Sequence, residues 1–330
     1  MNAKLEMLNT IQAVNMALDY AMGNDPNVIV LGEDVADREE GGVMGVTKGL
    51  STKYGVSRVR STPISEQAII GAAIGAAIVG MRPVAEIMLM NFTTVAMDMI
   101  VNHAAKLRFM SGGQTHVPMV IRTMTGAGFS AGGQHSDFLE AWFAHTAGLK
   151  VVVPSSPAEA YGLMLSCIED DDPCIFIENI ASYWIPGPMP EKGVRIPLGK
   201  ANVVRKGADV TVIGYSRQVH DIAAVAEKLA AENIAVEVID LRTISPLDTE
   251  TILNSVAKTR RAVIVHEAVK NFGVGAEISA RINEGLFGQL LAPVGRVGSA
   301  FCPVPFSKPL ETAFMPSQSD IEAAIRATLK

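Results

Sequence analysis

The segment from Gly126 to Ser136, GAGFSAGGQHS, is rich in glycine and carries a histidine near its end. Glycine allows a backbone to approach a ligand closely, and His135 has the side-chain type that moves protons most readily near neutral pH. An isolated histidine in a loop more often caps the first turn of a helix, and we expect a helix to begin at Asp137. Both interpretations of His135 stay open at this point.

Glu66 lies in STPISEQAIIG, at the predicted start of a helix with glycine and alanine on several faces. A carboxylate in a first turn is ordinarily a capping partner, here with Ser65 or Thr62. Small apolar neighbours would instead leave it poorly solvated and raise its proton affinity, as acid catalysis requires. Glu33, in GEDV, ends the first predicted strand at the edge where α/β sites gather, although it could also be a solvated loop residue.

Two short motifs within the glycine-rich segment suggest other chemistry. Residues 126–131 match GxGxxA, but a dinucleotide site needs an acid at the end of the next strand, where this chain has proline and serine. Residues 128–132 match GxSxG, and Asp240 and His266 follow Ser130 in hydrolase order. Glycines flank Ser130 where an elbow needs a strand and a helix, so a serine hydrolase is a remote alternative.

Two motifs that anchor phosphorylated ligands do not occur in the sequence. There is no GxxxxGK[ST] loop, and no GDG followed by an asparagine-rich stretch to hold a magnesium diphosphate. If this chain contacts a diphosphate cofactor, another chain must supply the anchor.

Alternating apolar strands and periodic helices must position these residues. Continuous apolar runs are typical of parallel strands covered on both faces, so a doubly wound α/β domain is predicted over 1–185. Its expected strands are 28–31, 83–89, 118–123, 149–153 and 174–178, and its expected helices include 11–22, 93–110 and 157–168.

The second half repeats the pattern after an interruption. Prolines and glycines break every period near 186–207, which we assign as a linker, and a smaller α/β domain is predicted over 208–330. Residues 302–316, CPVPFSKPLETAFMP, are too rich in proline for regular structure, so an extended surface arm is expected before a last helix ending at Lys330. Gly71–Gly80 is too short to span a bilayer and predicts a buried helix.

Composition excludes several classes of protein. The chain has 330 residues, 48% of them hydrophobic and 19% charged, which predicts a folded chain of two domains. Twenty-eight basic and 34 acidic residues give a net charge of −6, and no basic stripe carries interleaved aromatics, so neither nucleic acid nor membrane is an expected partner. Three cysteines without a CxxC pair, and a start unlike a signal or transit peptide, favour a cytoplasmic location.

Ten collinear blocks make the sequence similar to a known family over nearly the whole chain. They are GEDV, GGVMGVTKGL, TPISE, GMRPVAEIM, AAKLRFMSGG, GQHS, GLKVVVPSSP, VEVIDLRTISPLD, FGVGAEI and CPVPFSKPLE. Their order and spacing resemble the beta chain of the thiamine-diphosphate-dependent 2-oxo acid dehydrogenases, which include the pyruvate, branched-chain and acetoin enzymes. That resemblance implies a pyrimidine-binding domain followed by a smaller transketolase-type C-terminal domain.

The resemblance also implies roles for individual residues. Glu66 corresponds to the acid that hydrogen-bonds the aminopyrimidine ring of thiamine diphosphate, and His135 to the histidine that orients the substrate and assists acyl transfer to a lipoyl arm. Phe92 would lie against the pyrimidine, with Ile64 and Met88 lining the same pocket, unless these three are ordinary core residues. The expected cofactor-binding set is Glu33, Ile64, Glu66, Met88 and Phe92.

Metals and partners follow from the same resemblance. Relatives hold a potassium ion through backbone oxygens, which by position would belong here to Met119, Cys167, Asp170 and Asp172. An alpha chain would carry the missing diphosphate motif and magnesium, so the beta chain would be active only in a heterotetramer of two alpha and two beta chains. This assembly would dock onto a lipoyl-bearing acyltransferase core, with 302–316 as part of the docking surface.

The substrate stays open between a 2-oxo acid and acetoin. GGVMGVTKGL looks most like the acetoin branch, whereas FGVGAEISARINEG looks more like the pyruvate branch. Asp137 and Asn91 depart from residues common among relatives. Two further functions stay open: a single-chain transketolase-like carboligase, which the missing diphosphate motif disfavours, and a non-catalytic assembly subunit.

Overall fold

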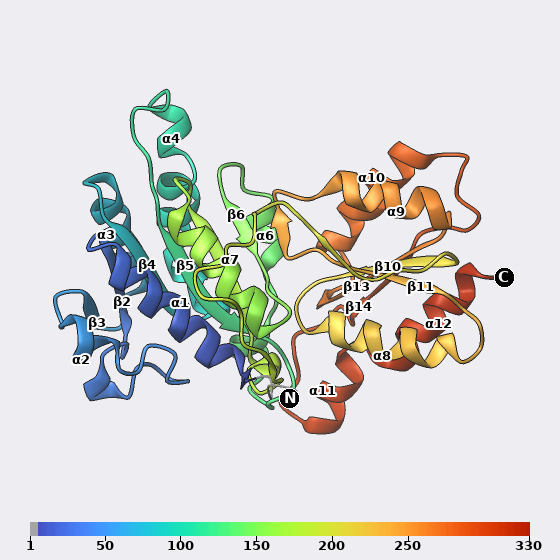
Figure 1. Ribbon diagram of the computed structural model, residues 1–330, viewed down its shortest axis with the longest axis horizontal. Coiled ribbons are helices and arrows are strands. Elements are labelled where there is room, and N and C mark those ends of the chain that lie inside the picture. Colours follow the sequence, from blue (N-terminus) through green and yellow to red (C-terminus); the bar gives the residue numbers. More distant parts are fainter. Residues whose placement is uncertain (1–5) are drawn as a thin grey trace, which may run out of the picture. The chain divides into compact units, whose positions relative to one another are not determined.

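The chain folds as two α/β units, seen in Figure 1 in a computed structural model that describes residues 6–330. Unit 1 consists of Met1–Thr125 and Trp142–Leu198, and unit 2 of Gly126–Ala141 and Gly199–Lys330. The predicted linker, 186–207, contains the boundary near Leu198. The domain bounds 1–185 and 208–330 stay a prediction, and no sequence pattern indicated that 126–141 would join unit 2.

Unit 1 is built on parallel strands in the order β6-β7-β5-β4-β2-β3. Their bounds are β2 (Val28–Glu33), β3 (Val59–Thr62), β4 (Arg82–Leu89), β5 (Val120–Thr125), β6 (Lys150–Val152) and β7 (Cys174–Asn179). A short antiparallel pair joins β1 (Met7–Leu8) to β8 (Gly187–Pro188). Parallel pairing places the carboxyl ends of these strands at one edge of the sheet.

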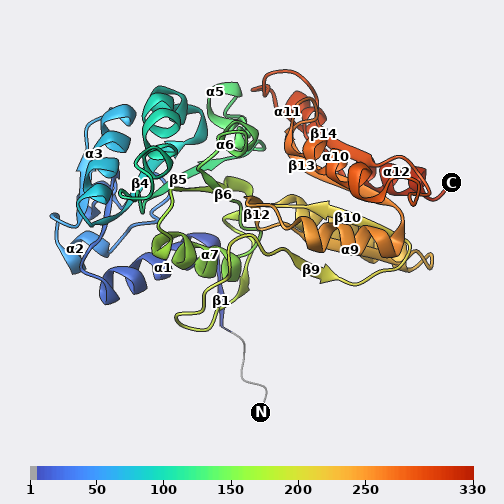
Figure 2. The same cartoon turned by 90° about the horizontal axis from the view of Figure 1, so that it is seen from above.

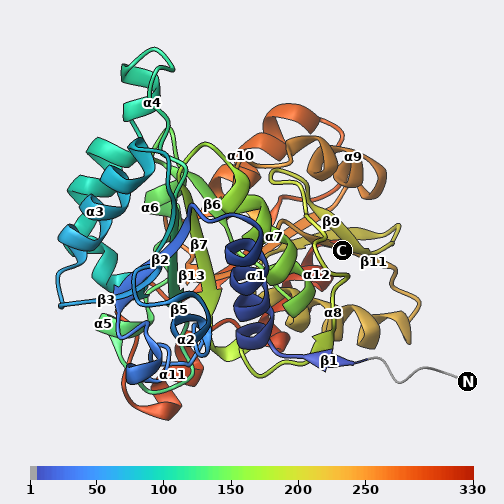
Figure 3. The same ribbon diagram turned by 60° about the vertical axis from the view of Figure 1, so that its left-hand side comes forward.

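Helices cover both faces of this sheet, as a doubly wound domain requires. On one face lie α1 (Thr10–Asn24), started by a capping box on Asn9, and α7 (Pro157–Glu169), and these two helices pack side by side. Figures 2 and 3 show α3 (Glu66–Ile78) on the opposite face. Two short elements, η1 (Asp37–Glu39) and α2 (Leu50–Tyr54), connect β2 to β3.

One predicted helix of unit 1 is wrong. Instead of a single helix over 93–110, the chain forms a 3₁₀ helix, η2 (Met90–Ala96), a π-helical turn, η3 (Met99–Ala104), and a short α4 (Leu107–Met110). The hydroxyl of Thr93 donates to the Met90 carbonyl at 2.5 Å, and that of Thr94 to the Asn91 carbonyl at 2.7 Å. These local bonds compete with the α-helical pattern and tighten the first turns.

Helix α3 differs from the predicted buried helix. Beyond Gln67 it consists only of apolar and glycine residues, but Ala72, Gly75 and Ile78 are exposed, and Val79 at its end is 78% exposed. A helix that is apolar on all sides is normally covered on all sides. Within residues 6–330, no helix has the length and apolar character needed to cross a membrane.

Unit 2 carries a five-stranded sheet in the order β14-β13-β10-β11-β9, in which only β9 is antiparallel to its neighbour. The strands are β9 (Asn202–Arg205), β10 (Val210–Gly214), β11 (Val236–Asp240), β13 (Ala262–Val269) and β14 (Gly295–Ser299). In Figure 1, α9 (Thr249–Thr259) and α10 (Val274–Leu286) cover one face, and α8 (Gln218–Ala230) and α12 (Gln318–Thr328) the other. The predicted two-domain α/β fold is confirmed.

The proline-rich arm is more regular than predicted. Residues 302–316 contain α11 (Lys308–Phe314), with Pro309 in its first turn. Proline is tolerated there because the first N–H groups of a helix have no intrahelical acceptor. The prediction of an irregular arm is therefore wrong for its second half.

Candidate active site

Glu33 and Glu66 lie at the carboxyl edge of the sheet in unit 1. Glu33 ends β2 and is paired in register with Thr62 at the end of β3, and the chain then turns into α3, which begins at Glu66. Burial raises the pKa of Glu33, and the nearby charges of Glu66 and Asp34 raise it further. Both effects favour the protonated form of Glu33 over its charged form.

Glu66 is not used as a helix cap. Its N-cap residue, Ser65, makes no side-chain capping bond, and across residues 6–330 the Glu66 carboxylate has no hydrogen bond or ion pair. The carboxylate is only half-buried, so the predicted poor solvation is not present in this chain by itself. Ile64 beside it is 81% exposed. This edge therefore presents an unpaired acid next to an uncovered apolar side chain.

The other predicted pocket residues come from the next strand. Met88 lies near the end of β4, and Phe92 lies in η2, which packs against α3. Both side chains are partly exposed. The interpretation of Ile64, Met88 and Phe92 as ordinary core residues therefore does not fit their exposure.

A buried charged cluster supports this edge from within the sheet. Arg122, on β5, is ion-paired with Glu86 on β4 and with Glu178 on β7, and Tyr183 donates to Glu178 Oε2 at 2.8 Å. Burial raises the pKa of Glu86, against the lowering effect of the Arg122 charge. Removing one partner of such a cluster leaves an uncompensated buried charge, so it ties three adjacent strands together. The sequence does indicate this cluster, because each of the three apolar strands contains a charged residue, but the sequence analysis did not predict it.

His135 belongs to unit 2. It lies in α5 (Gly133–Ser136), a single helical turn, and its side chain is partly exposed. The prediction that a helix begins at Asp137 is wrong, because Asp137 is extended and α6 (Glu140–Ala144) starts only at Glu140. His135 is therefore in a short turn of its own.

The glycine-rich loop before His135 is bound by acidic side chains of its own unit. The Ala127 N–H donates to Glu267 Oε1 at 2.7 Å, and the N–H groups of Gly128 and Ser130 donate to the Glu311 carboxylate. In a dinucleotide site such N–H groups would face a phosphate. Here a carboxylate takes that place, so the GxGxxA match does not mark a dinucleotide site.

Comparison with known proteins shows the family to which the chain belongs. Residues 6–183 match the transketolase pyrimidine-binding domain, and residues 199–321 match the transketolase C-terminal domain. The chain is 48% identical over 326 residues to the beta subunit of acetoin:2,6-dichlorophenolindophenol oxidoreductase from Cupriavidus necator, which covers 96% of each chain. It belongs to the beta subunits of the thiamine-dependent pyruvate and acetoin dehydrogenases.

Other relatives agree with this family. The chain is 44% identical to the mitochondrial pyruvate dehydrogenase E1 component subunit beta of Bos taurus, over 96% of this chain and 89% of that one. A solved structure described as a split-gene transketolase, inactive beta4 tetramer, superimposes with a TM-score of 0.77 at 22% identity and covers 98% of each chain, which shows the shared fold. Membership in the dehydrogenase beta-subunit family favours the predicted function over a carboligase or an assembly subunit.

The hydrolase hypothesis finds no support in this beta subunit. Burial lowers the pKa of His266 to about 4, and its Nδ1 lies 3.0 Å from the Ala268 carbonyl oxygen, where a triad would need a carboxylate. Asp240 Oδ1 accepts the Arg242 N–H. Ser130 is exposed and has a left-handed φ of 57°.

We expect Ser130→Ala to retain full activity in the assembled dehydrogenase, because the backbone N–H of Ser130 binds Glu311 whereas its hydroxyl makes no hydrogen bond to residues 6–330. Alanine keeps that N–H and adopts the left-handed φ of this position at a cost similar to that of serine. The free energy of unfolding should therefore change by about 0.5 kcal/mol or less. Steady-state turnover of the reconstituted enzyme measures this. A large loss of kcat would support Ser130 as a nucleophile instead.

Glu140 provides a pH-dependent prediction. It is fully buried in unit 2, where the Tyr215 hydroxyl donates to its Oε1 at 2.6 Å, and burial raises its pKa to about 7. Between about pH 4.5 and pH 7, Glu140 therefore keeps its proton in the native chain and loses it in the unfolded chain. The free energy of unfolding falls as the pH rises through this range. Glu140→Gln, which mimics the protonated acid, should be neutral at pH 5 but stabilising by on the order of 2 kcal/mol at pH 8. Urea unfolding at both pH values checks this, and equal effects at the two would contradict it.

The four residues expected at a potassium site all belong to unit 1. Met119 precedes β5, Cys167 is in α7, and Asp170 and Asp172 are in the connection to β7. The Met119 carbonyl accepts the Cys174 N–H at 2.9 Å, and the Asp170 carbonyl accepts Arg82 Nη1 at 3.0 Å. A carbonyl has a second lone pair, so backbone oxygens here still fit a hard cation. No group of three histidine, cysteine or acidic side chains suited to a metal occurs among the described residues.

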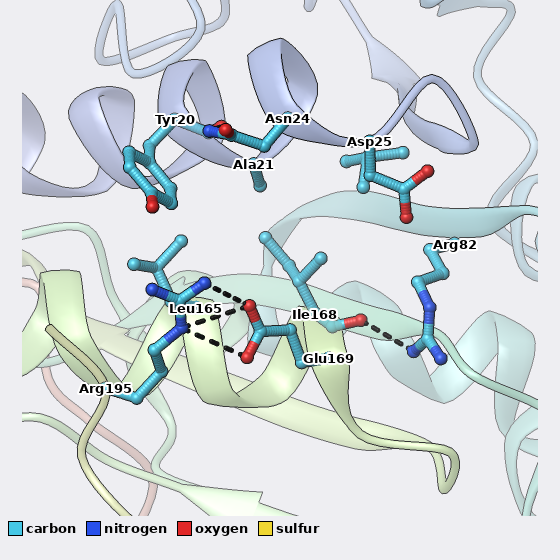
Figure 4. Close-up of a pocket in the computed structure, with 10 residues that line it drawn as sticks. Tyr20, Ala21, Asn24, Asp25, Arg82, Leu165, Ile168, Glu169 and Arg195 are labelled. Carbon is cyan, nitrogen blue, oxygen red and sulfur yellow. Dashed lines mark hydrogen bonds and ion pairs between the residues drawn. The ribbon is translucent and has the colours of Figure 1, made fainter. Parts of the chain in front are cut away.

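A pocket of about 250 Å³ between α1 and α7 is shown in Figure 4. Arg195 at one end is paired with Glu169, and Arg82 at the other donates to the Ile168 carbonyl at 2.9 Å. These charged groups of the pocket are therefore already paired within the chain. We assign no ligand to it.

Proposed function

We propose that this beta chain binds the pyrimidine half of thiamine diphosphate at the edge formed by β2, α3 and η2. The observation that carries this proposal is the unpaired Glu66 carboxylate at the start of α3, beside Glu33, whose pKa is raised. The match to a pyrimidine-binding domain over 6–183 supports the same edge. Glu33, Ile64, Glu66, Met88 and Phe92 are the proposed cofactor-binding residues.

The available groups fit this cofactor. A ring nitrogen needs a carboxyl partner, and Glu66 has none within the described chain. An aromatic ring needs apolar contacts, and Ile64, Met88 and Phe92 are exposed enough to supply them. When bound, thiamine diphosphate supplies a carbon centre that adds to a carbonyl and accepts the electrons released by C–C cleavage.

Glu66 would hold a proton between its carboxyl oxygen and the pyrimidine nitrogen. Contact with the ring and with a partner chain would remove water from Glu66, which is half-buried in this chain alone, and would raise its proton affinity toward that of a general acid. Glu33, whose pKa is raised by burial and by the charges of Glu66 and Asp34, would take up a proton more readily than an ordinary glutamate.

His135 is proposed to act on the substrate. An imidazole can donate to the carbonyl oxygen of a 2-oxo acid or of acetoin and later assist transfer of the acyl group to a lipoyl arm. His135 lies in a single helical turn and is partly exposed, which supports this role.

The partner is proposed to be an alpha chain that carries the diphosphate and magnesium site, in a heterotetramer of two alpha and two beta chains. The sequence has no diphosphate motif, and the exposed side of α3 requires a cover. A lipoyl-bearing acyltransferase core is the proposed acyl acceptor. The free thiols of Cys167, Cys174 and Cys302 support a reducing, cytoplasmic location.

Co-expression with alpha chains from neighbouring genes tests this function. The purified pair should release product from pyruvate, another 2-oxo acid or acetoin only when thiamine diphosphate and magnesium are present. One substrate should exceed the others in kcat/KM, and that comparison identifies the branch. Activity of the beta chain alone would exclude the proposed division of the site.

We also propose a structural potassium ion held by the backbone oxygens of Met119, Cys167, Asp170 and Asp172. Because the ion would bind the native state only, KCl should raise the midpoint of thermal unfolding relative to choline chloride at equal ionic strength. A stabilisation of about 2.7 kcal/mol is expected at 100 times the dissociation constant. Identical midpoints in the two salts would exclude this site.

A further inference from the structure

We propose that Glu311 is a positioning residue for His135: its carboxylate fills an anion-binding concavity in the glycine-rich loop and so holds the turn that carries the histidine. This inference rests on the proposed role of His135. Both residues belong to unit 2, and their contacts are part of that unit.

Backbone N–H groups converge on the Glu311 carboxylate. The Gly128 N–H donates to Oε1 at 2.7 Å, and the Ser130 N–H lies 3.0 Å from Oε1 and 3.1 Å from Oε2. Gly128 and Ser130 have φ values of 117° and 57°, and backbone of this type turns its N–H groups toward one point. Glu311 is fully buried, so its charge depends on these donors.

The same helix also holds the carbonyl side of the loop. Lys308, at the start of α11, donates from Nζ to the Gly128 carbonyl at 2.6 Å. Gly128 is therefore bound at its N–H by Glu311 and at its oxygen by Lys308, three residues apart on one helix. Figures 2 and 3 show α11 beside α5, which contains His135.

The chain between this clamp and His135 is short and closely packed. A Cβ on Gly132, whose φ is 76°, would lie 2.5 Å from the Phe306 ring, and one on Gly133 would lie 3.5 Å from the Val304 nitrogen. Ser130 and His135 are separated by only four residues, two of which are thus packed against 303–306. The packing of Gly132 and Gly133 against 303–306 limits how much of a displacement at Ser130 can be absorbed before His135.

A carboxylate is needed at this position for a physical reason. Glutamine would keep an oxygen that can accept from the Gly128 and Ser130 N–H groups, but it carries no charge and would turn NH₂ donors toward the Ser130 N–H, so it should bind these donors more weakly than a carboxylate. Glu311→Gln should therefore loosen the loop although it preserves side-chain volume. Loss of one charge-assisted bond corresponds to about a tenfold change in an equilibrium.

The first experiment measures amide hydrogen exchange in the full-length chain. In Glu311→Gln, exchange in the peptide 126–136 should accelerate about tenfold, with the strands of both sheets unchanged. Lys308→Met, at an exposed site, should accelerate the same peptide to a smaller extent. Glu277→Gln is the matched control, because Glu277 lies on α10 in the same unit and is ion-paired with Arg281 at the surface. Unchanged exchange in Glu311→Gln would overturn the proposal.

The second experiment uses chemical rescue in the assembled enzyme. Glu311→Ala should lower acyl transfer about tenfold or more, and added acetate should restore most of it by entering the vacated concavity, whereas acetamide should not. If Glu311→Ala does not fold, Glu311→Gln and Lys308→Met carry the test of acyl transfer. Acyl transfer at the wild-type rate in these variants, or an Ala variant that acetate and acetamide restore equally, would contradict a positioning role.

His135→Ala separates this inference from the proposed function. If His135→Ala retains full acyl transfer, the role of His135 fails, and the exchange result for Glu311→Gln still reports whether the loop is held. If His135→Ala is impaired but the Glu311 variants transfer acyl groups normally, only the positioning inference fails. Acetate should not restore His135→Ala.

Discussion

Glu66→Gln is expected to lower the rate of decarboxylation or acetoin cleavage by 100-fold or more, in the range of about 10²–10⁴ that general acid–base groups contribute. Glutamine has the same size but cannot share a proton with a ring nitrogen. Glu66 makes no ion pair or hydrogen bond within the described chain, so the substitution should leave the free energy of unfolding nearly unchanged. Single-turnover kinetics in the reconstituted alpha–beta complex measure the expected loss.

Gln67→Ala is the matched control for Glu66→Gln. Gln67 is the next residue of α3 and is exposed, so its variant tests damage to the helix start without touching the acid. The affinity for thiamine diphosphate should be measured for both variants, since weak binding alone would change KM for the cofactor rather than the single-turnover rate. Undiminished turnover in Glu66→Gln would refute the role of Glu66.

His135→Ala is expected to impair acyl transfer to a lipoyl group by about 100-fold while the affinity for thiamine diphosphate changes little. The physical reason is the proposed division of roles: the His135 imidazole is proposed to act on the substrate and the acyl group, whereas other side chains are proposed to bind the cofactor. Reductive acylation of a free lipoyl domain measures the transfer step. Turnover with an artificial electron acceptor does not require acyl transfer to a lipoyl group, so the substitution should lower it less than it lowers reductive acylation.

Gln134→Ala controls for disturbance of the one-turn helix that contains His135. Gln134 is exposed in the same turn, so its variant should behave like the wild type. A His135→Ala variant that fails only to bind the cofactor, with transfer intact once it is saturated, would contradict the assigned role. Loss of acyl transfer in both variants would show that the substitutions act by disturbing the helical turn rather than by removing the imidazole.

The sequence was sufficient to predict the two-unit α/β architecture because apolar runs and periodic helices repeat along the chain. It was insufficient where local hydrogen bonds override periodicity, as at Thr93 and Thr94, whose hydroxyls bond to carbonyls three residues back. It also misjudged 302–316, because none of the prolines there lies in the interior of the helix and Pro309 stands in its first turn, where proline is tolerated.

The candidate site was predictable only where it depends on local pattern. Glu66 and Glu33 could be proposed because strand ends and helix starts meet at one edge of a parallel sheet. Glu311 could not be found, because its partners Gly128 and Ser130 are more than 180 residues away and no spacing rule connects them. Long-range tertiary contacts of this kind leave no period in the sequence.

The uncovered side of α3 has a consequence for the cell. Newly made beta chains that outnumber their partner would display Ile64, Ile78 and Val79 to chaperones and proteases, which recognise exposed apolar segments of incompletely assembled proteins. We expect the abundance of this chain to follow that of its alpha partner, with surplus copies degraded. Balanced synthesis of the two chains, as translation from one messenger RNA provides, would then be a condition of a full yield of enzyme.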